Sequence, residues 1–98
     1  TYYYEVWSDL GRIILHENLA LKAIPYLEHA YKITGDVPGI NYLLASFFLN
    51  INNTEKAFRH LSLALEIGKD QYNEFKDLFP VSLITRKITR LLRNYNLI

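Results

Sequence analysis

Residues 4–37, YEVWSDLGRIILHENLALKAIPYLEHAYKITGDV, are followed directly by residues 38–71, PGINYLLASFFLNINNTEKAFRHLSLALEIGKDQ, and the two stretches align without a gap. Nine of the 34 aligned positions are identical, and most of the nine hold leucine, alanine or isoleucine. A fixed period of this length is typical of proteins built from repeated helical hairpins. The repeat therefore predicts a protein that binds a partner rather than an enzyme.

Each repeat is predicted to contain two helices. Apolar residues between Val6 and Leu15 recur at helical rather than alternating spacing. Asn18 and Asn52 occupy the same place in the two repeats, where we expect them to cap the second helix of each hairpin. Gly35 is expected to end the second helix of the first repeat in a left-handed conformation.

Small residues recur at three positions of the period, and large apolar residues surround them. A larger side chain at such a position overpacks a close helix crossing and costs about 1–3 kcal/mol. We therefore expect helices to cross closely at Gly11 and Ala45, at Ala23 and Ala57, and at Ala30 and Ala64.

The run Trp7-x-x-Leu10-Gly11-x-x-Ile14, followed by Ala23-x-x-x-Leu27-x-x-Ala30, resembles the tetratricopeptide repeat. The period, the small positions and the order of the large positions agree in both repeats, although Asn41 stands where the first repeat has Trp7. The resemblance covers residues 4–71 well and residues 72–98 in part. The chain is similar to the C-terminal part of bacterial proteins of this family.

The resemblance implies an all-α fold, an α-solenoid of antiparallel helical hairpins with about six helices in a right-handed superhelix. Residues 1–98 then form a single domain, with repeats at 4–37 and 38–71 and a partial third repeat at 72–98. In that third repeat Phe79 replaces the small residue and Pro80 interrupts the helix. A terminal capping helix is expected beyond Pro80, with apolar Ile88 and Leu92 on one side and basic residues on the other.

Composition excludes several classes of function. The net charge of +1 favours neither nucleic acid nor anionic membrane, and the absence of cysteine excludes disulfides and thiolate metal sites. No apolar run reaches the roughly 18 residues of a membrane span. The chain begins at Thr1 and lacks methionine, so we expect a piece of a longer protein. The compartment stays open, with the cytoplasm favoured.

No catalytic motif is present in the sequence. A glycine-rich phosphate loop, a His-x-x-x-His pair and a nucleophile elbow are all missing. The three histidines occupy unrelated places in the repeat, which disfavours a metal site. We therefore predict no enzyme activity, no cofactor and no metal.

The resemblance implies that a peptide or partner protein binds the concave surface lined by the first helix of each repeat. Carried over position by position, the contact residues are Glu5, Ser8, Asp9, Arg12 and His16, then Tyr42, Leu43, Ser46, Leu49 and Asn50, then Asn73, Lys76 and Asp77. Leu43 and Asp77 stand where chaperone-binding members use amide or cationic groups, so no clamp for a chaperone tail is expected. Arg12 is the expected anchor for a partner carboxylate.

A second hypothesis remains open from the sequence. The edge from Tyr2 to Trp7 is rich in aromatic residues, and it is a candidate surface for self-association as a homodimer or for packing inside a larger protein. In that case the segment could regulate a catalytic domain elsewhere in a parent chain. The sequence does not identify the partner under either hypothesis.

Overall fold

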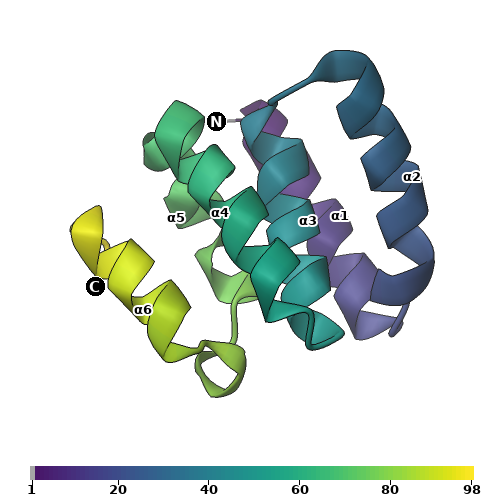
Figure 1. The fold of residues 1–98 in the computed structure, drawn as a ribbon. Helices are drawn as coiled ribbons and strands as arrows, with labels where there is room; N and C mark the ends of the chain where they lie inside the picture. Colours follow the sequence, from purple (N-terminus) through teal and green to yellow (C-terminus); the bar gives the residue numbers. More distant parts are fainter. Residues whose placement is uncertain (1) are drawn as a thin grey trace.

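The two repeats form two helical hairpins in the computed structural model, which describes residues 2–98 and their side chains except those of Tyr2, Tyr3 and Val81 (Figure 1). The first hairpin is α1 (Tyr2–His16) with α2 (Ala20–Thr34), and the second is α3 (Pro38–Asn50) with α4 (Thr54–Gly68). The remaining elements are η1 (Lys69–Gln71), α5 (Tyr72–Phe75), η2 (Lys76–Leu78), η3 (Val81–Leu83) and α6 (Arg86–Asn94). All these elements are helical, which confirms the all-α class.

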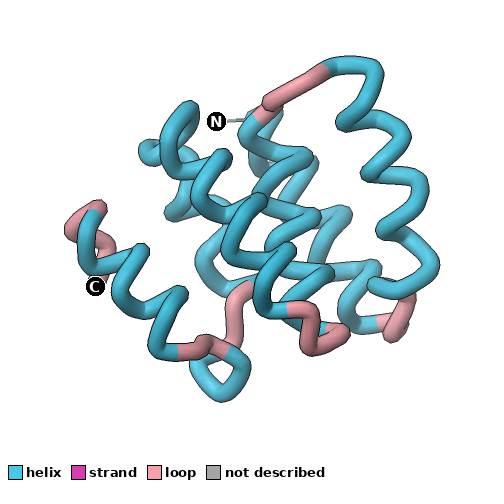
Figure 2. The backbone as a smooth tube through the Cα atoms, in the orientation of Figure 1, coloured by secondary structure: helices cyan, strands magenta, loops and turns pink. Residues whose placement is uncertain are grey.

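Short loops connect the helices, and Figure 2 shows loops only between and after them. Gly35 takes a φ of 77° and its N–H donates to the Tyr31 carbonyl at 2.8 Å, which confirms the expected helix end. Asn18 and Asn52 have φ values of 57° and 64°, so they make left-handed turns and do not cap the next helix. The cap of α4 is instead Asn53, whose side chain accepts from the Lys56 N–H at 3.2 Å.

The core lies around α3, and Figure 1 shows this helix between α4 and the first hairpin. Every residue from Gly39 to Leu49 is buried. Close crossings explain the small residues. A Cβ on Gly11 would lie 2.6 Å from Leu43 Cδ2, and Ala45, Ala57 and Ala64 are fully covered. The predicted crossings are therefore confirmed for α3 and α4, whereas Ala23 and Ala30 on α2 are only partly covered.

The third repeat does not form a helical hairpin. The single-turn α5 is flanked by two 3-10 segments, and this stretch folds back onto α1 and α3. Among residues 2–98 five helices are longer than one turn, where about six helices were expected. The radius of gyration of 12.1 Å is close to the value of about 13 Å for a globular domain of this size.

The last helix has the two faces expected of a cap. Ile88 and Leu92 are buried, and the basic residues of α6 are exposed. Thr85 caps the start of this helix, and its hydroxyl accepts from the Ile88 N–H at 3.4 Å. Lys87 Nζ lies 4.4 Å from the centre of the Phe58 ring, which ties α6 to α4.

Candidate functional site

The surface of α1 and α3 predicted to receive a peptide is covered by residues 72–79 of the same chain. The Tyr42 ring stacks on Phe75 with ring centres 4.8 Å apart. The Tyr42 hydroxyl donates to the Gly68 carbonyl at 2.7 Å, and the Ser46 hydroxyl donates to the Leu78 carbonyl at 2.8 Å. The polar atoms expected to meet a partner therefore hold the backbone of the chain itself.

Burial corrects five of the predicted contact residues. Ser8, Tyr42, Leu43, Ser46 and Leu49 are all buried, each at 2% exposure or less. A partner cannot reach them in this conformation. Burial of the Tyr42 phenol also raises its pKa well above the ordinary value, since ionisation would place a charge in the core.

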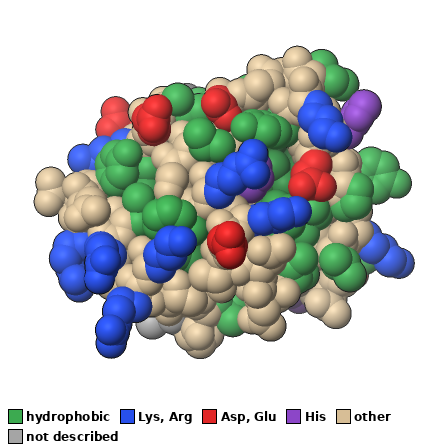
Figure 3. Space-filling model, in the orientation of Figure 1, with side chains coloured by type: hydrophobic (Ala, Val, Ile, Leu, Met, Phe, Trp, Pro, Cys, Tyr) green, Lys and Arg blue, Asp and Glu red, His purple; other side chains and the backbone are tan. Residues whose placement is uncertain are grey.

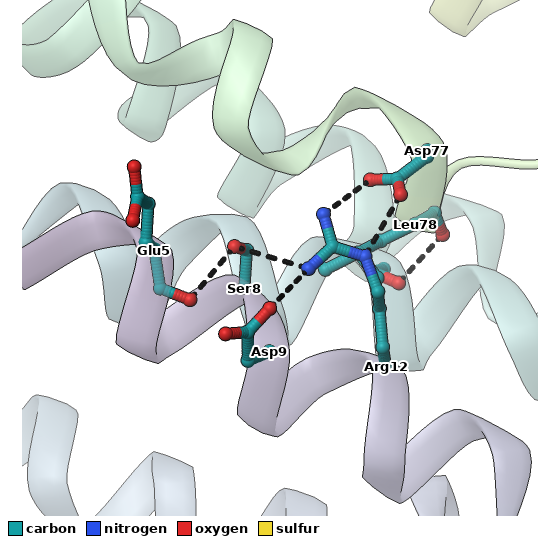
Figure 4. A network of polar contacts seen from close by, with 7 residues as sticks. Glu5, Ser8, Asp9, Arg12, Asp77 and Leu78 are labelled. Carbon is teal, nitrogen blue, oxygen red and sulfur yellow. Dashed lines mark hydrogen bonds and ion pairs between the residues drawn. The ribbon is translucent and has the colours of Figure 1, made fainter. Parts of the chain in front are cut away.

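Arg12 anchors a carboxylate, but the carboxylate is that of Asp77 (Figure 4). Its Nε and Nη2 atoms donate to the two oxygens of Asp77 at 2.8 and 3.2 Å. Its Nη1 atom donates to Asp9 at 2.7 Å and lies 3.4 Å from the buried Ser8 hydroxyl. The hydrogen bond that Arg12 donates to Asp77 is the main reason that the Arg12 pKa is raised. The expected partner anchor is thus used to hold η2 against α1.

The other predicted contact residues are exposed. Asn50 donates to the Ser46 carbonyl at 3.3 Å, and His16 Nδ1 lies 3.2 Å from the carboxylate of its neighbour Glu17. The rest of the exposed set is Glu5, Asp9, Asn73 and Lys76. Within the described residues, no group of three or more His, Cys, Asp or Glu side chains is placed to hold a metal ion. None of the helices described here has the length and apolar content needed to cross a bilayer.

The first hairpin instead exposes a set of large apolar side chains, which we call the α1–α2 face. Spacing of three or four residues puts each helix's contribution on one stripe. Figure 3 shows hydrophobic side chains reaching the surface over α2, at the right of the view. The members are Val6, Leu10 and Ile13 on α1 with Leu19, Tyr26 and Ile33 on or beside α2.

A small pocket joins the two helices within the α1–α2 face. It has a volume of about 210 Å³ and lies where α1 ends and α2 begins. Its lining is Ile14, Leu19, Lys22, Ala23 and Tyr26. Lys22 is the one charged residue of this lining, so the pocket suits an apolar group with an acid beside it.

The residues one period later show that this exposure is unusual. Leu10 is 44% exposed and Leu44 is 0% exposed; Ile13 is 61% exposed and its counterpart Phe47 is 0% exposed. Tyr26 is 80% exposed, while His60 is 5% exposed. The apolar spacing in the sequence predicted core residues in both repeats.

A polar network marks the place where α2 covers the second hairpin. His60 Nδ1 lies 2.9 Å from the Asn41 side-chain oxygen, and the Asn41 amide donates to Asp36 at 3.4 Å. Since the Asn41 oxygen can only accept, His60 must carry its proton on Nδ1. Burial lowers the His60 pKa, and the nearby Arg59 charge lowers it further. His60 is therefore a neutral structural residue at pH 7.

Comparison with protein-family models, curated proteins and solved structures gives no match to the chain, so its assignment to the tetratricopeptide repeats stays a prediction from the residues of the repeat.

Proposed function

We propose that the chain is a non-catalytic protein-interaction module of the tetratricopeptide type, and that it binds its partner through the α1–α2 face. The 34-residue repeat and the two helical hairpins support the family assignment and a right-handed stack of hairpins. Because residues 72–79 cover the surface of α1 and α3, the proposal moves the contact to the apolar side chains exposed on α1 and α2.

One observation carries this proposal. Leu10 and Leu44 are the same residue at the same place in the repeat, yet the first is exposed and the second lies in the core. Exposed contiguous apolar patches on soluble proteins mark interaction sites. Their burial against a partner is worth roughly 25 cal/mol for each Å² removed from water. The α1–α2 face therefore has both the composition and the driving force of an interface.

Self-association is the second candidate, because a second copy could cover the same face. A two-fold dimer would place the α1–α2 face of each copy against that of the other. Trp7 lies beside this face and packs over Gly39, whereas the side chains of Tyr2 and Tyr3 lie outside the described part of the structure. The mass of the protein in solution separates the two candidates.

The proposal is tested with two variants that each replace two exposed residues. An Ile13→Glu/Tyr26→Glu variant charges the α1–α2 face. An Asp9→Ala/Lys76→Ala variant changes two exposed residues among those that the sequence predicted as peptide contacts. A partner captured by the parent protein is purified, and its affinity for each variant is measured by calorimetry. We expect a loss of at least tenfold for the first variant and none for the second. Equal binding by all three proteins, each folded by circular dichroism, would overturn the proposal.

A further inference from the structure

We propose that the pocket of Ile14, Leu19, Lys22, Ala23 and Tyr26 receives an aromatic side chain from an amphipathic helix of a partner protein. The same helix carries an acidic residue three positions before the aromatic one, and this acid pairs with Lys22. The inference rests on the proposed function, because it names what the α1–α2 face binds. It follows from the equivalent side-chain cluster on the second hairpin, against which a helix of the same chain packs.

The counterpart lies one period later, on the second hairpin. Phe48, Lys56 and His60 stand there in the places of Ile14, Lys22 and Tyr26. The His60 ring stacks on Phe48 with centres 5.7 Å apart, and Lys56 Nζ lies 5.4 Å from the centre of the Phe48 ring. These three side chains form one cluster, as their counterparts do at the exposed pocket.

Helix α2 occupies the counterpart with an aromatic residue. The Tyr31 ring meets His60 edge to face, with ring centres 5.5 Å apart and planes at 83°. Such a contact adds about 0.5–1.5 kcal/mol to the burial of the ring. The lining of the exposed pocket comes only from α1, α2 and the connection between them, and Tyr26 is 80% exposed there.

An acid accompanies this aromatic residue on α2. Glu28 stands three positions before Tyr31, on the same side of the helix, and lines one cavity with Tyr31 and Lys56. The repeat keeps a lysine at this position, since Lys22 corresponds to Lys56. A helix bound to the first hairpin in the manner of α2 would therefore place its acid beside Lys22.

The rest of α2 supplies the expected apolar pattern. Its residues turned toward the core are Ala20, Ile24 and Leu27, which precede Tyr31 by 11, 7 and 4 positions. These intervals lie on one face of a helix, the arrangement by which amphipathic helices fill apolar surfaces. The partner segment is thus predicted as a small residue, two aliphatic residues, an acid and an aromatic residue at these spacings.

The two pockets differ in polarity, and this difference selects the occupant. Tyr26 stands in the place of His60 and Trp7 in the place of Asn41, so the first hairpin lacks the His60–Asn41 hydrogen bond of the second. An aromatic residue buries a large apolar area there without leaving a polar group unpaired. A partner helix that offers a lysine or arginine at the acid position would place two like charges together beside Lys22.

The experiment uses a peptide with the sequence of residues 20–34 as the probe. Positions 25 and 29 are exposed in α2, so a hydrocarbon staple between them keeps the peptide helical without touching the contact side. Anisotropy of a labelled peptide reports its binding to the whole chain. We expect saturable binding to the parent protein, and at least tenfold weaker binding when the peptide carries Tyr31→Ala or the protein carries Ile13→Glu.

Charge reversal tests the acid separately. The protein variant Lys22→Glu should weaken binding of the parent peptide severalfold, and a Glu28→Lys peptide should recover the affinity for this variant. The matched control is Lys56→Glu, the same change one period later, which should leave binding unchanged. Loss of binding with Lys56→Glu would mean that the peptide displaces α2, and it would overturn the inference.

The remaining outcomes separate this inference from the proposed function. Absence of peptide binding to the parent protein overturns the partner helix, while the proposed function still stands if Ile13→Glu/Tyr26→Glu abolishes capture of a partner. If Tyr31→Ala and Lys22→Glu leave peptide binding unchanged but Ile13→Glu abolishes it, the assignment of the pocket is wrong, while the α1–α2 face remains the binding surface. A parent protein that instead sediments as a dimer, does not bind the peptide and is converted to a monomer by Ile13→Glu would mean that a second copy of the chain covers the α1–α2 face.

Discussion

The two hairpins share a 34-residue pattern and nine identical residues, yet they are buried to very different degrees. Helices α3 and α4 pack against each other closely, whereas α1 and α2 make few contacts with one another. Six residues of α4 are buried and only two of α2, namely Ala20 and Ile24. The comparison shows that the sequence of a repeat encodes its helices, while its neighbours determine how much of it is core.

The physical cause is the number of elements around each first helix. Helix α3 packs against α1, α2, α4 and α5, so all its sides are covered. Helix α1 packs mainly against α3 and the segment from Tyr72 to Leu78. A helical-hairpin repeat cannot bury its apolar face alone. The first hairpin is therefore the part of the fold that buries the least apolar surface.

The largest expected effect comes from one substitution made in both hairpins. Leu44→Ala should lower the free energy of unfolding by about 2–5 kcal/mol, because it leaves a cavity in the core. Leu10→Ala, its counterpart, should cost about 1 kcal/mol or less, since its side chain is already 44% exposed. Urea denaturation measures both values, and equal losses would show that α1 is covered in solution.

A smaller effect is expected where α1 meets its own cover. Gly11→Val should cost about 1–3 kcal/mol, because its Cβ would lie 2.6 Å from Leu43 Cδ2 and 2.8 Å from Leu78 Cδ1. Thermal unfolding measures this loss. Hydrogen exchange should also speed up in residues 72–79, while α4 exchanges as before. A variant as stable as the parent would mean that residues 72–79 do not rest on α1 in solution.

Acid should weaken the second hairpin but not the first, because only His60 is a buried ionisable residue at this place in the repeat. The folded pKa of His60 lies below its ordinary value of 6.5. Its contribution is therefore complete above about pH 6.5 and falls as the pH drops toward the folded pKa. Urea denaturation between about pH 7 and pH 5 should show this fall. A His16→Gln/His29→Gln variant should show the same fall, and its disappearance there would assign the effect to those residues.

The smallest expected effect concerns the ion pair that holds η2 to α1. Arg12 and Asp77 are 44% and 55% exposed, so Asp77→Asn should lower the free energy of unfolding by about 0.2–1 kcal/mol. Salt near 1 M should shrink the difference, because it screens exposed charges. A loss above about 2 kcal/mol, beyond the range of exposed pairs, would show that the pair is shielded from water.

Sequence reasoning predicted the helices well because their signals are local. The apolar spacing placed all four helices of the hairpins, Gly35 marked a helix end, and Ile88 and Leu92 marked the buried side of α6. The asparagines were misread because both a cap and a left-handed turn favour Asn18 and Asn52. Only the backbone angles distinguish these two roles.

The candidate site was harder to predict because it depends on contacts far apart in sequence. Pro80 and Phe79 correctly indicated that the third repeat is irregular, but no local signal showed that this stretch returns to α1. Arg12 and Asp77 were each assigned to the binding surface, although they are 65 residues apart and bind each other. The open α1–α2 face could not be predicted either, because its residues have the pattern of a core.

The cover formed by residues 72–79 has a consequence for competition. A tethered segment on a short linker acts at an effective concentration in the millimolar range. A free peptide of equal intrinsic affinity at about 1 μM would be outcompeted roughly a thousandfold, which corresponds to about 4 kcal/mol. Ser46 and Tyr42 donate to carbonyl groups of the same chain, so their hydroxyl protons are already used in hydrogen bonds. Ligands that reach this protein must bind somewhere that the chain does not already bind itself.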